Sequence, residues 1–189
     1  MEKTNKKLIM FIGKTHSGKT TFAKEIEKNN ENVISLEADP MALFIHDQFP
    51  RLKKFEDKTF NGSFKKLALK FQVLLLFIKT IMSLGKPIIL SNSNLWKKGR
   101  DRVFKISKKF DYENIGVYFD FPEDFLIERI KKSKRTKKIL STSKDFHDLI
   151  IRQRARVQPP NPKDFDKFFV IKSEKDLKTV KNKILEILK

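Results

Sequence analysis

The sequence predicts an α/β fold in which a five-stranded parallel sheet carries helices on both faces. Two observations support this prediction. Short apolar segments alternate with helical segments along the chain, and the first apolar segment runs directly into a glycine-rich loop. Parallel neighbours need a long crossover connection, and the helical segments supply it. We expect a single domain over residues 1–189, a length that suits one sizeable core.

The glycine-rich loop has the pattern G-x-x-x-x-G-K-T, which is typical of phosphate-binding loops. A strand is predicted before it, over 8–12, and a helix after it, to about residue 29. Because strand, loop and helix follow in this order, a chance glycine-rich turn is a poor alternative. We expect ATP to be bound by Gly13, Lys14, Thr15, His16, Ser17, Gly18, Lys19, Thr20 and Thr21. Lys19 should reach the β- and γ-phosphates, and the Thr20 hydroxyl should ligate Mg²⁺.

The remaining elements follow in alternation. Further strands are predicted over 33–36, 87–90, 115–119 and 168–171. Helices are predicted at 41–45, as one turn or two, and over 63–84, 98–109, 123–132, 141–156 and from 174 onward. Residues 50–62 are interpreted as a mobile connection, and Ser173 to Asp176 resembles a capping box.

Two carboxylates, Glu37 and Asp39, follow the second predicted strand. In an open parallel sheet this end of the strands carries the ligands. A carboxylate beside the γ-phosphate could accept the proton of an attacking hydroxyl, so both residues are candidates for a catalytic base. The alternative is a strand-end carboxylate that only caps the next helix.

A cationic segment runs from Arg129 to Lys138, and it could close over ATP as a basic lid. Most of its lysines fit a solvated helix face equally well. Arg129 and Arg135 are better candidates, because arginine is scarce in this chain and suits bidentate phosphate contacts. We also assign Asn92, Asn94, Arg100 and Arg102, at and after the third predicted strand, to binding of the acceptor.

The formal net charge is +19, which favours a phosphate-rich partner such as a nucleic acid. A compositional bias explains the charge equally well, because only eight of the 42 basic residues are arginine. The chain has no cysteine, which excludes a disulfide scaffold and fits the cytoplasm. The apolar run near the start is too short for a signal peptide or a membrane span.

Several segments occur in an order that resembles the kinase domain of phage-type polynucleotide 5′-hydroxyl kinases and their relatives. The relatives include seryl-tRNA kinases, zeta-toxin-like kinases and small sugar or antibiotic kinases. The resemblance rests on the phosphate loop, Ser91 to Leu95, Val117 to Pro122, Glu128-Arg129, and Gln158 to Asp166. It covers nearly the whole chain and implies a P-loop NTPase/kinase fold.

The resemblance also implies roles for individual residues. The catalytic acid of the family follows the second strand, where Glu37 matches best and Asp39 second. Polynucleotide kinases have a motif similar to S-D-T-N at the third strand, and here Asn92 replaces its acid. The lid of the family has two arginines four positions apart; Arg129 matches the first, and Ser133 occupies the second position.

Together these features predict an ATP- and Mg²⁺-dependent kinase that phosphorylates a hydroxyl group. A nucleic-acid 5′-hydroxyl is the preferred acceptor, and a nucleoside, sugar or antibiotic is the nearest alternative. A P-loop ATPase or nucleotide switch without an acceptor is a different class. The lack of an acid at the end of the third strand counts against it. A basic nucleic-acid-binding protein with a vestigial nucleotide site is a third class, which the intact loop disfavours.

Overall fold

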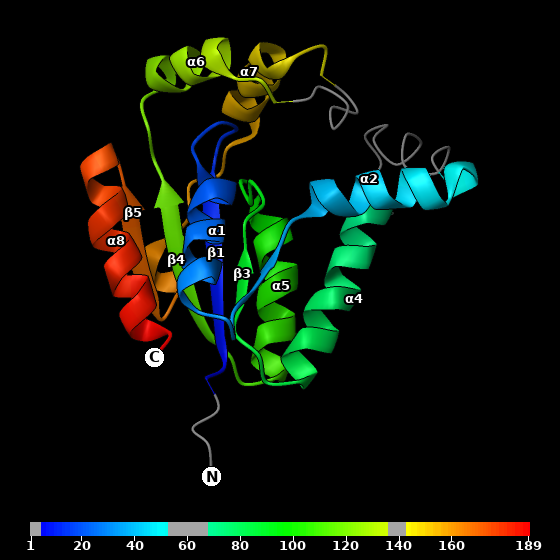
Figure 1. Ribbon diagram of the computed structural model, residues 1–189, viewed down its shortest axis with the longest axis vertical. Coiled ribbons are helices and arrows are strands. Elements are labelled where there is room, and N and C mark those ends of the chain that lie inside the picture. The colour runs from blue at the N-terminus through cyan, green and yellow to red at the C-terminus, as the bar shows by residue number, and fades with distance from the viewer. Residues whose placement is uncertain (1–4, 53–67, 136–142) are drawn as a thin grey trace.

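The structure is a computed structural model, and it describes residues 5–52, 68–135 and 143–189. The strands are β1 (Lys7–Gly13), β2 (Ile34–Leu36), β3 (Ile88–Leu90), β4 (Glu113–Phe119) and β5 (Lys167–Ile171). The α-helices are α1 (Lys19–Asn29), α2 (Ala38–Gln48), α4 (Leu69–Ser83), α5 (Lys97–Lys109), α6 (Glu123–Lys132), α7 (Phe146–Arg156) and α8 (Glu174–Ile187). Two short 3₁₀ helices are η1 (Pro50–Leu52) and η4 (Pro162–Asp164). Figure 1 shows one layer of strands with helices on either side.

The five strands pair in parallel in the order β2-β3-β1-β4-β5, which confirms the predicted sheet. The next two strands along the chain, β2 and β3, lie on one side of β1, and the last two, β4 and β5, lie on the other side. The order therefore reverses at β1, and open parallel sheets bind ligands at such a reversal. The predicted phosphate loop leaves the sheet at this point.

β1 is buried on both faces. Side chains from Leu8 to Ile12 have no exposed surface. Ile9 and Phe11 pack into one core with residues of α1 and α8, whereas Leu8, Met10 and Ile12 pack into a second core with residues of α4 and α5. Successive side chains of a strand point to opposite faces, so one apolar run fills both cores.

Helix boundaries differ from the prediction at three places. The predicted 63–84 helix begins at Leu69, because Ala68 has an extended backbone with ψ 144°; residues 63–67 lie outside the described residues. The predicted 141–156 helix begins at Phe146, after Asp145 caps it by accepting the N–H of Asp148. Residues 141 and 142 are also outside the described part.

α2 is longer than the one or two turns predicted, because it starts at Ala38 with Pro40 in its first turn. A proline is tolerated there, since the N–H groups of the first turn have no partner within the helix. The predicted capping box of α8 is confirmed: Ser173 and Asp176 make both of its reciprocal contacts. Of the predicted mobile connection over 50–62, only η1 is among the described residues.

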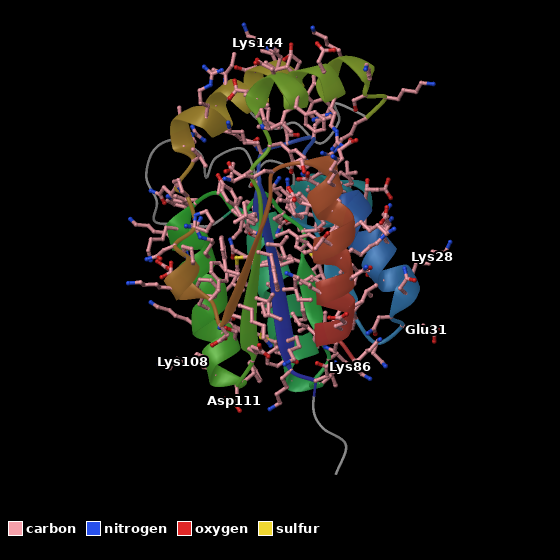
Figure 2. All side chains as sticks on the ribbon, turned by 90° about the vertical axis from the view of Figure 1, so that its left-hand side faces the viewer. Lys28, Glu31, Lys86, Lys108, Asp111 and Lys144 are labelled. Carbon is pink, nitrogen blue, oxygen red and sulfur yellow. The ribbon has the colours of Figure 1, made fainter. Side chains whose placement is uncertain are left out.

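α6 and α7 lie beyond the C-terminal ends of the strands, over the phosphate loop (Figure 1). In Figure 2, Lys144 marks this end of the molecule, and Lys108 and Asp111 mark the opposite end. The predicted lid falls on α6 and the residues after it, with 136–138 outside the described residues. None of the described helices is long and apolar enough to cross a membrane.

Replacement of Gly116 in β4 tests the packing of the sheet. A Cβ there would lie 2.6 Å from Cδ2 of Phe168 and 2.9 Å from Cδ1 of Phe165. We expect Gly116→Ala to lower the free energy of unfolding by about 1–3 kcal/mol, as overpacking does. The measurement is urea denaturation followed by circular dichroism. Gly99→Ala is the matched control, since a Cβ at Gly99 in α5 meets nothing within 4 Å. Equal stability of the two variants would contradict the packing described here.

Candidate active site

A cavity of about 640 Å³ lies between the strand ends and the α6–α7 pair. Sequence-predicted residues that line it are Thr15, His16, Gly18, Lys19, Thr20, Thr21, Glu37, Asp39, Asn92, Arg129 and Arg135. A smaller cavity of about 350 Å³, beside the start of β4, contains none of the predicted residues. The larger cavity is therefore the candidate active site.

The glycines of the phosphate loop stand where other residues would be strained or would clash. Gly18 has φ 91° and is the N-cap of α1. Gly13 has φ 157°, and a Cβ there would lie 2.9 Å from the carbonyl oxygen of Phe119. The Gly13 N–H donates to the carbonyl of Ser93 at 2.9 Å, which ties the start of the loop to the exit of β3. The N-terminus of α1 thereby borders the cavity, an arrangement that favours phosphate.

Lys19 is folded back into the loop. Its Nζ donates to the carbonyl oxygen of Lys14 at 2.7 Å and to Oγ of Ser17 at 2.9 Å. The residue is only 8% exposed, and burial lowers the pKa of its ammonium group to about 7. An anionic phosphate beside Nζ would favour the charged form.

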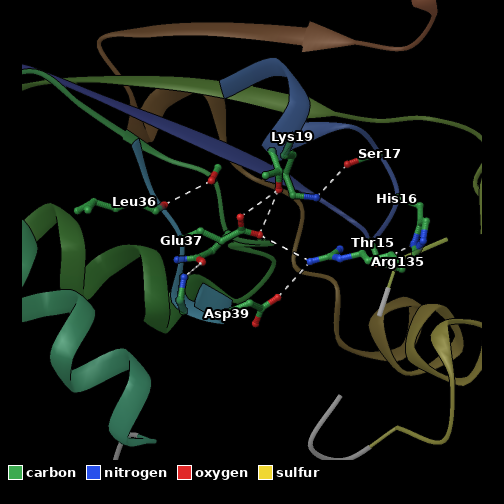
Figure 3. A network of polar contacts seen from close by, with 12 residues as sticks. Thr15, His16, Ser17, Lys19, Leu36, Glu37, Asp39 and Arg135 are labelled. Carbon is green, nitrogen blue, oxygen red and sulfur yellow. Dashed lines mark hydrogen bonds and ion pairs between the residues drawn. The ribbon is translucent and has the colours of Figure 1, made fainter. Parts of the chain in front are cut away.

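Glu37 and Asp39 meet the phosphate loop and the lid in one network (Figure 3). The Thr20 hydroxyl donates to the Glu37 carboxylate, with distances of 3.1 and 3.2 Å to its two oxygens. Nη2 of Arg135 lies 3.3 Å from Asp39 and 3.8 Å from Glu37. Burial, together with the nearby Asp39 carboxylate, raises the pKa of Glu37. A raised pKa makes a carboxylate a stronger base.

The capping alternative for Glu37 is wrong. Glu37 occupies the N-cap position of α2, but its side chain makes no capping hydrogen bond. Oδ1 of Asn92 instead accepts the N–H of Ala38 at 2.7 Å. The Asn92 amide thus replaces the carboxylate as a partner of the helix terminus, and Glu37 turns toward Thr20.

The hydroxyl oxygen of Thr20 fits Mg²⁺ as a protein ligand. Among the described residues, no group of three or more His, Asp or Glu side chains could hold a metal ion by itself. Mg²⁺ takes oxygen ligands and usually keeps several waters and substrate phosphates, with only one or two protein ligands. The Thr20 hydroxyl supplies one suitable protein oxygen beside the phosphate loop, and the phosphates and waters would complete the coordination.

Arg129 lies directly against the loop. Its guanidinium stacks over Phe125, 4.5 Å from the ring centroid, and Nη1 donates to the carbonyl of His16 at 3.4 Å. Nη2 pairs with Glu174 at the start of α8 at 2.9 Å. A Cβ on Gly18 would lie 3.3 Å from Nη1, so the guanidinium borders the predicted phosphate site. Of the predicted lid, Arg129 and Arg135 both line the cavity, as do Lys132 and Ser133.

α7 contacts successive residues of the phosphate loop. Oε1 of Gln153 accepts the N–H of Thr15 at 2.7 Å. The ring of Phe146 packs edge-on against His16 with a centroid distance of 4.7 Å. The phosphate loop therefore contacts α7 through the backbone of Thr15 and through the side chain of His16.

Glu123, at the start of α6, makes a further connection. Its carboxylate accepts from Nζ of Lys14 at 3.0 Å and from Nε of Arg154 in α7 at 3.1 Å. Arg154 and Lys14 lower the pKa of Glu123 to about 2. One carboxylate thus joins the loop, α6 and α7.

Three of the predicted acceptor-binding residues lie away from the cavity. Asn94 has φ 47°, and its Nδ2 donates to the carbonyl of Phe11 at 2.7 Å. Arg100 is 1% exposed, and its Nη1 donates to the Asn94 carbonyl at 2.9 Å. These two residues shape the chain after β3. Arg102, also on α5, does not line the cavity.

Sequence reasoning missed several lining residues, among them Lys70, Phe71, Phe146 and Gln153. No local pattern marks them. Lys70 and Phe71 lie in the first turn of α4, and Lys70 reaches Asp39 at 3.4 Å. The cluster of arginines around Gln153 is the one signal in the sequence that could have pointed to α7.

A family model described as "AAA domain" (AAA_33) matches residues 8–160. Among solved structures, Kti12 of Chaetomium thermophilum in complex with ADP-AlF3 has a TM-score of 0.65 at 13% identity, with 96% of this chain and 99% of that chain covered. The APS kinase CysC of Mycobacterium tuberculosis, in complex with AMPPNP and APS, has a TM-score of 0.59 at 15% identity, covering 96% of each chain.

A gluconokinase of Sinorhizobium meliloti has a TM-score of 0.58 at 16% identity, with 97% of this chain and 91% of that chain covered. At these identities the likeness shows the fold. No curated protein matches the chain in sequence. The family match and the fold together support a P-loop nucleotide-dependent kinase or ATPase.

His16 should make folding depend on pH. Burial, helped by nearby Arg135, lowers the pKa of its imidazole from 6.5 to about 4. Below pH 6.5 the unfolded chain binds this proton and the folded chain does not, so stability falls as the pH drops toward 4. We expect a contribution of about 1 kcal/mol between pH 7 and pH 5, allowing for partial solvent exposure.

The variant for this test is His16→Asn, because asparagine tolerates the left-handed backbone at φ 59°. Urea denaturation at pH 7 and pH 5 should show a smaller loss of stability in the variant than in the wild type. The pH 7 values are the internal control, since the imidazole is mostly neutral there in both states. An identical pH dependence in the two proteins would contradict the assignment.

Proposed function

We propose that this chain, which belongs to the AAA-domain family whose model matches residues 8–160, is an ATP- and Mg²⁺-dependent phosphotransferase. It transfers the phosphoryl group to a hydroxyl group. The observation that carries the proposal is the Glu37 carboxylate. It lies beside the phosphate loop, is free of helix capping, and has a raised pKa. A carboxylate in this place can orient an acceptor hydroxyl, as a kinase needs, or a water, as an ATPase needs, so the assay without acceptor described below separates the two.

Each residue of the site has a role in this proposal. ATP supplies the γ-phosphoryl group, and Mg²⁺ neutralises charge on its phosphates. Lys19 and the N–H groups of the loop bind the phosphates, and Thr20 supplies a ligand for Mg²⁺. Glu37 orients the acceptor hydroxyl and accepts its proton, with Asp39 as the second candidate. Arg129 and Arg135 stabilise negative charge on the transferred group.

A nucleic-acid 5′-hydroxyl is the acceptor that we favour, on the net charge of +19 and the resemblance to polynucleotide kinases. A small-molecule acceptor is the nearest alternative, and gluconokinase and APS kinase among the similar structures favour it. Polynucleotide kinases have an acid where this chain has Asn92, and this difference also favours a small-molecule acceptor. We propose a cytoplasmic location, which the lack of cysteine fits.

Removal of the Lys19 ammonium or the Glu37 carboxylate should separate binding from chemistry. We expect Lys19→Ala to abolish transfer and weaken ATP binding, because the phosphates lose a buried cation. We expect Glu37→Gln to lower kcat by about 10²–10⁴-fold, the range of a lost general base, with ATP binding retained. Transfer of label from γ-labelled ATP measures kcat, and calorimetric titration with ATP measures ATP binding.

Glu31→Gln, in an exposed turn, is the control for the loss of a carboxylate. It should behave as the wild type in both assays. Full turnover by Glu37→Gln would exclude Glu37 as the base and move the role to Asp39. Rapid ATP hydrolysis without any acceptor would favour the ATPase instead.

The acceptor class can be tested with labelled γ-phosphate and a panel of 5′-hydroxyl DNA and RNA oligonucleotides, tRNA, nucleosides and sugars. For a nucleic-acid acceptor we expect label on the oligonucleotides and an oligonucleotide affinity that falls steeply with salt. Label on small molecules alone would indicate that the net charge reflects a compositional bias and not nucleic-acid binding. The Lys19→Ala protein is the control for contaminating kinases.

A further inference from the structure

The imidazole of His16 is a polar group of the cavity that the proposed mechanism does not use. Its Nδ1 lies 3.0 Å from Oγ1 of Thr15, whereas its Nε2 is buried and has no hydrogen-bond partner among the described residues. Six buried side-chain atoms in the described part of the chain have no partner, and three of them line this cavity, on His16, Asn92 and Ser143. A buried polar atom without a partner is costly, so such a group commonly meets a ligand or water.

Arg135 shows which part of the cavity the imidazole borders. The ring of Phe146 contacts both residues: its centroid is 4.7 Å from that of the His16 ring and 5.7 Å from Cζ of Arg135. Nη2 of Arg135 extends to Asp39 and Glu37, the two candidate bases (Figure 3). The transferred phosphoryl group must lie between the phosphate loop and the base. His16 therefore borders the position of the γ-phosphate.

The imidazole is uncharged at neutral pH. Burial, together with the cations of Arg135, Lys19 and Arg129, lowers its pKa to about 4. A neutral imidazole has one N–H, and the hydrogen bond made by the other nitrogen decides which nitrogen has it. When the Thr15 hydroxyl donates to Nδ1, the hydrogen is on Nε2. Nε2 is then a buried donor, surrounded by cations, that suits an anionic oxygen.

We propose that the Nε2–H of His16 donates a hydrogen bond to an oxygen of the γ-phosphoryl group of ATP, and that the Thr15 hydroxyl fixes the tautomer. This inference rests on the proposed function. In the transfer, the acceptor oxygen bonds to the γ-phosphorus, the bond from phosphorus to the β–γ bridging oxygen breaks, and ADP leaves. The acceptor proton goes to Glu37, and His16 keeps its own. His16 is then a catalytic residue, and Thr15 is a positioning residue.

The variants separate this contact from a structural role of His16. Its backbone has φ 59°, a left-handed conformation that histidine and asparagine both tolerate. His16→Asn keeps this backbone, but its amide is too short to place a donor where Nε2 is. Thr15→Val removes the hydroxyl and keeps the shape of the side chain. His147→Asn is the matched control, because His147 is exposed on α7 and does not line the cavity.

The quantity measured is the ratio of the Kd of ADP to the Kd of AMPPNP, each titrated with Mg²⁺ in a calorimeter. AMPPNP has the γ-phosphoryl group and ADP lacks it. We expect the wild type to prefer AMPPNP. In His16→Asn this preference should fall about tenfold, as the loss of a hydrogen bond to a charged group predicts, with the affinity for ADP unchanged. His147→Asn should keep the wild-type ratio.

Thr15→Val tests the tautomer. It should lower the preference for AMPPNP about three- to fivefold, the effect of one neutral hydrogen bond, and should have no further effect when combined with His16→Asn. The wild type alone gives a second measurement. Nitrogen–proton correlation spectra should show hydrogen on Nε2 of His16, with a proton resonance that AMPPNP shifts and ADP does not.

Three results would overturn this inference alone. They are equal losses of ADP and AMPPNP affinity in His16→Asn, an unchanged ratio in that variant, and hydrogen on Nδ1 in the spectra. Loss of the AMPPNP preference in His16→Asn, with label on no acceptor of the panel, would reject the proposed function and leave the γ-phosphate contact standing. Failure of the wild type to bind either nucleotide would reject both.

Discussion

The burial of β1 on both faces is the constraint on which the rest of the structure depends. Each side chain from Leu8 to Ile12 is fully enclosed, and alternate residues fill the two cores. Burial of this kind stabilises by roughly 25 cal/mol for each Å² of apolar surface removed from water. It also fixes the register of the strand, because a slip of one residue would exchange the contents of the two cores. The loop that follows therefore emerges at a fixed place, between the ends of β3 and β4.

From that fixed point the site assembles by topology. The strand order brings the exits of β2 and β3 beside the phosphate loop, so Glu37 and Asn92 reach it without a long side-chain path. Glu37 and Asn92 both lie at the start of α2, and only one of them can accept the N–H of Ala38. Asn92 accepts the free N–H of α2, and the carboxylate of Glu37 remains for Thr20. A neutral amide at this point thus helps to keep the charged group available.

Sequence reasoning recovered what local pattern controls. The phosphate loop, the five strands and the capping box at Ser173 all follow from short-range rules on glycine conformation, strand burial and helix capping. It also located the acids after β2, because every parallel strand delivers its last residues to the same edge. It assigned Arg100 to the acceptor, whereas the structure buries that guanidinium under Asn94. The sequence around Arg100 in α5 does not show whether its side chain faces the core or the cavity, because tertiary packing decides this.

Residues that reach the cavity from distant helices could not be found in this way. Lys70 has no neighbour in sequence that marks it, and the arginines around Gln153 point to α7 but not to Gln153 itself. Their partners, Asp39 and the N–H of Thr15, lie 31 and 138 positions away along the chain. Such contacts are set by tertiary packing, which single-sequence patterns do not encode.

Two direct contacts, and one bridge through Glu123 of α6, join α7 to the phosphate loop. Lys14 reaches α7 through Glu123, Thr15 through Gln153 and His16 through Phe146, so three successive loop residues are joined to one rigid helix. A tilt of the 11-residue helix α7 would act on the loop directly at Thr15 and His16, and through Glu123 of α6 at Lys14. Movement of α7 away from the cavity would then also change the conformation of the phosphate loop. Nucleotide exchange would be sensitive to substitutions on the outer face of α7 that never touch the nucleotide.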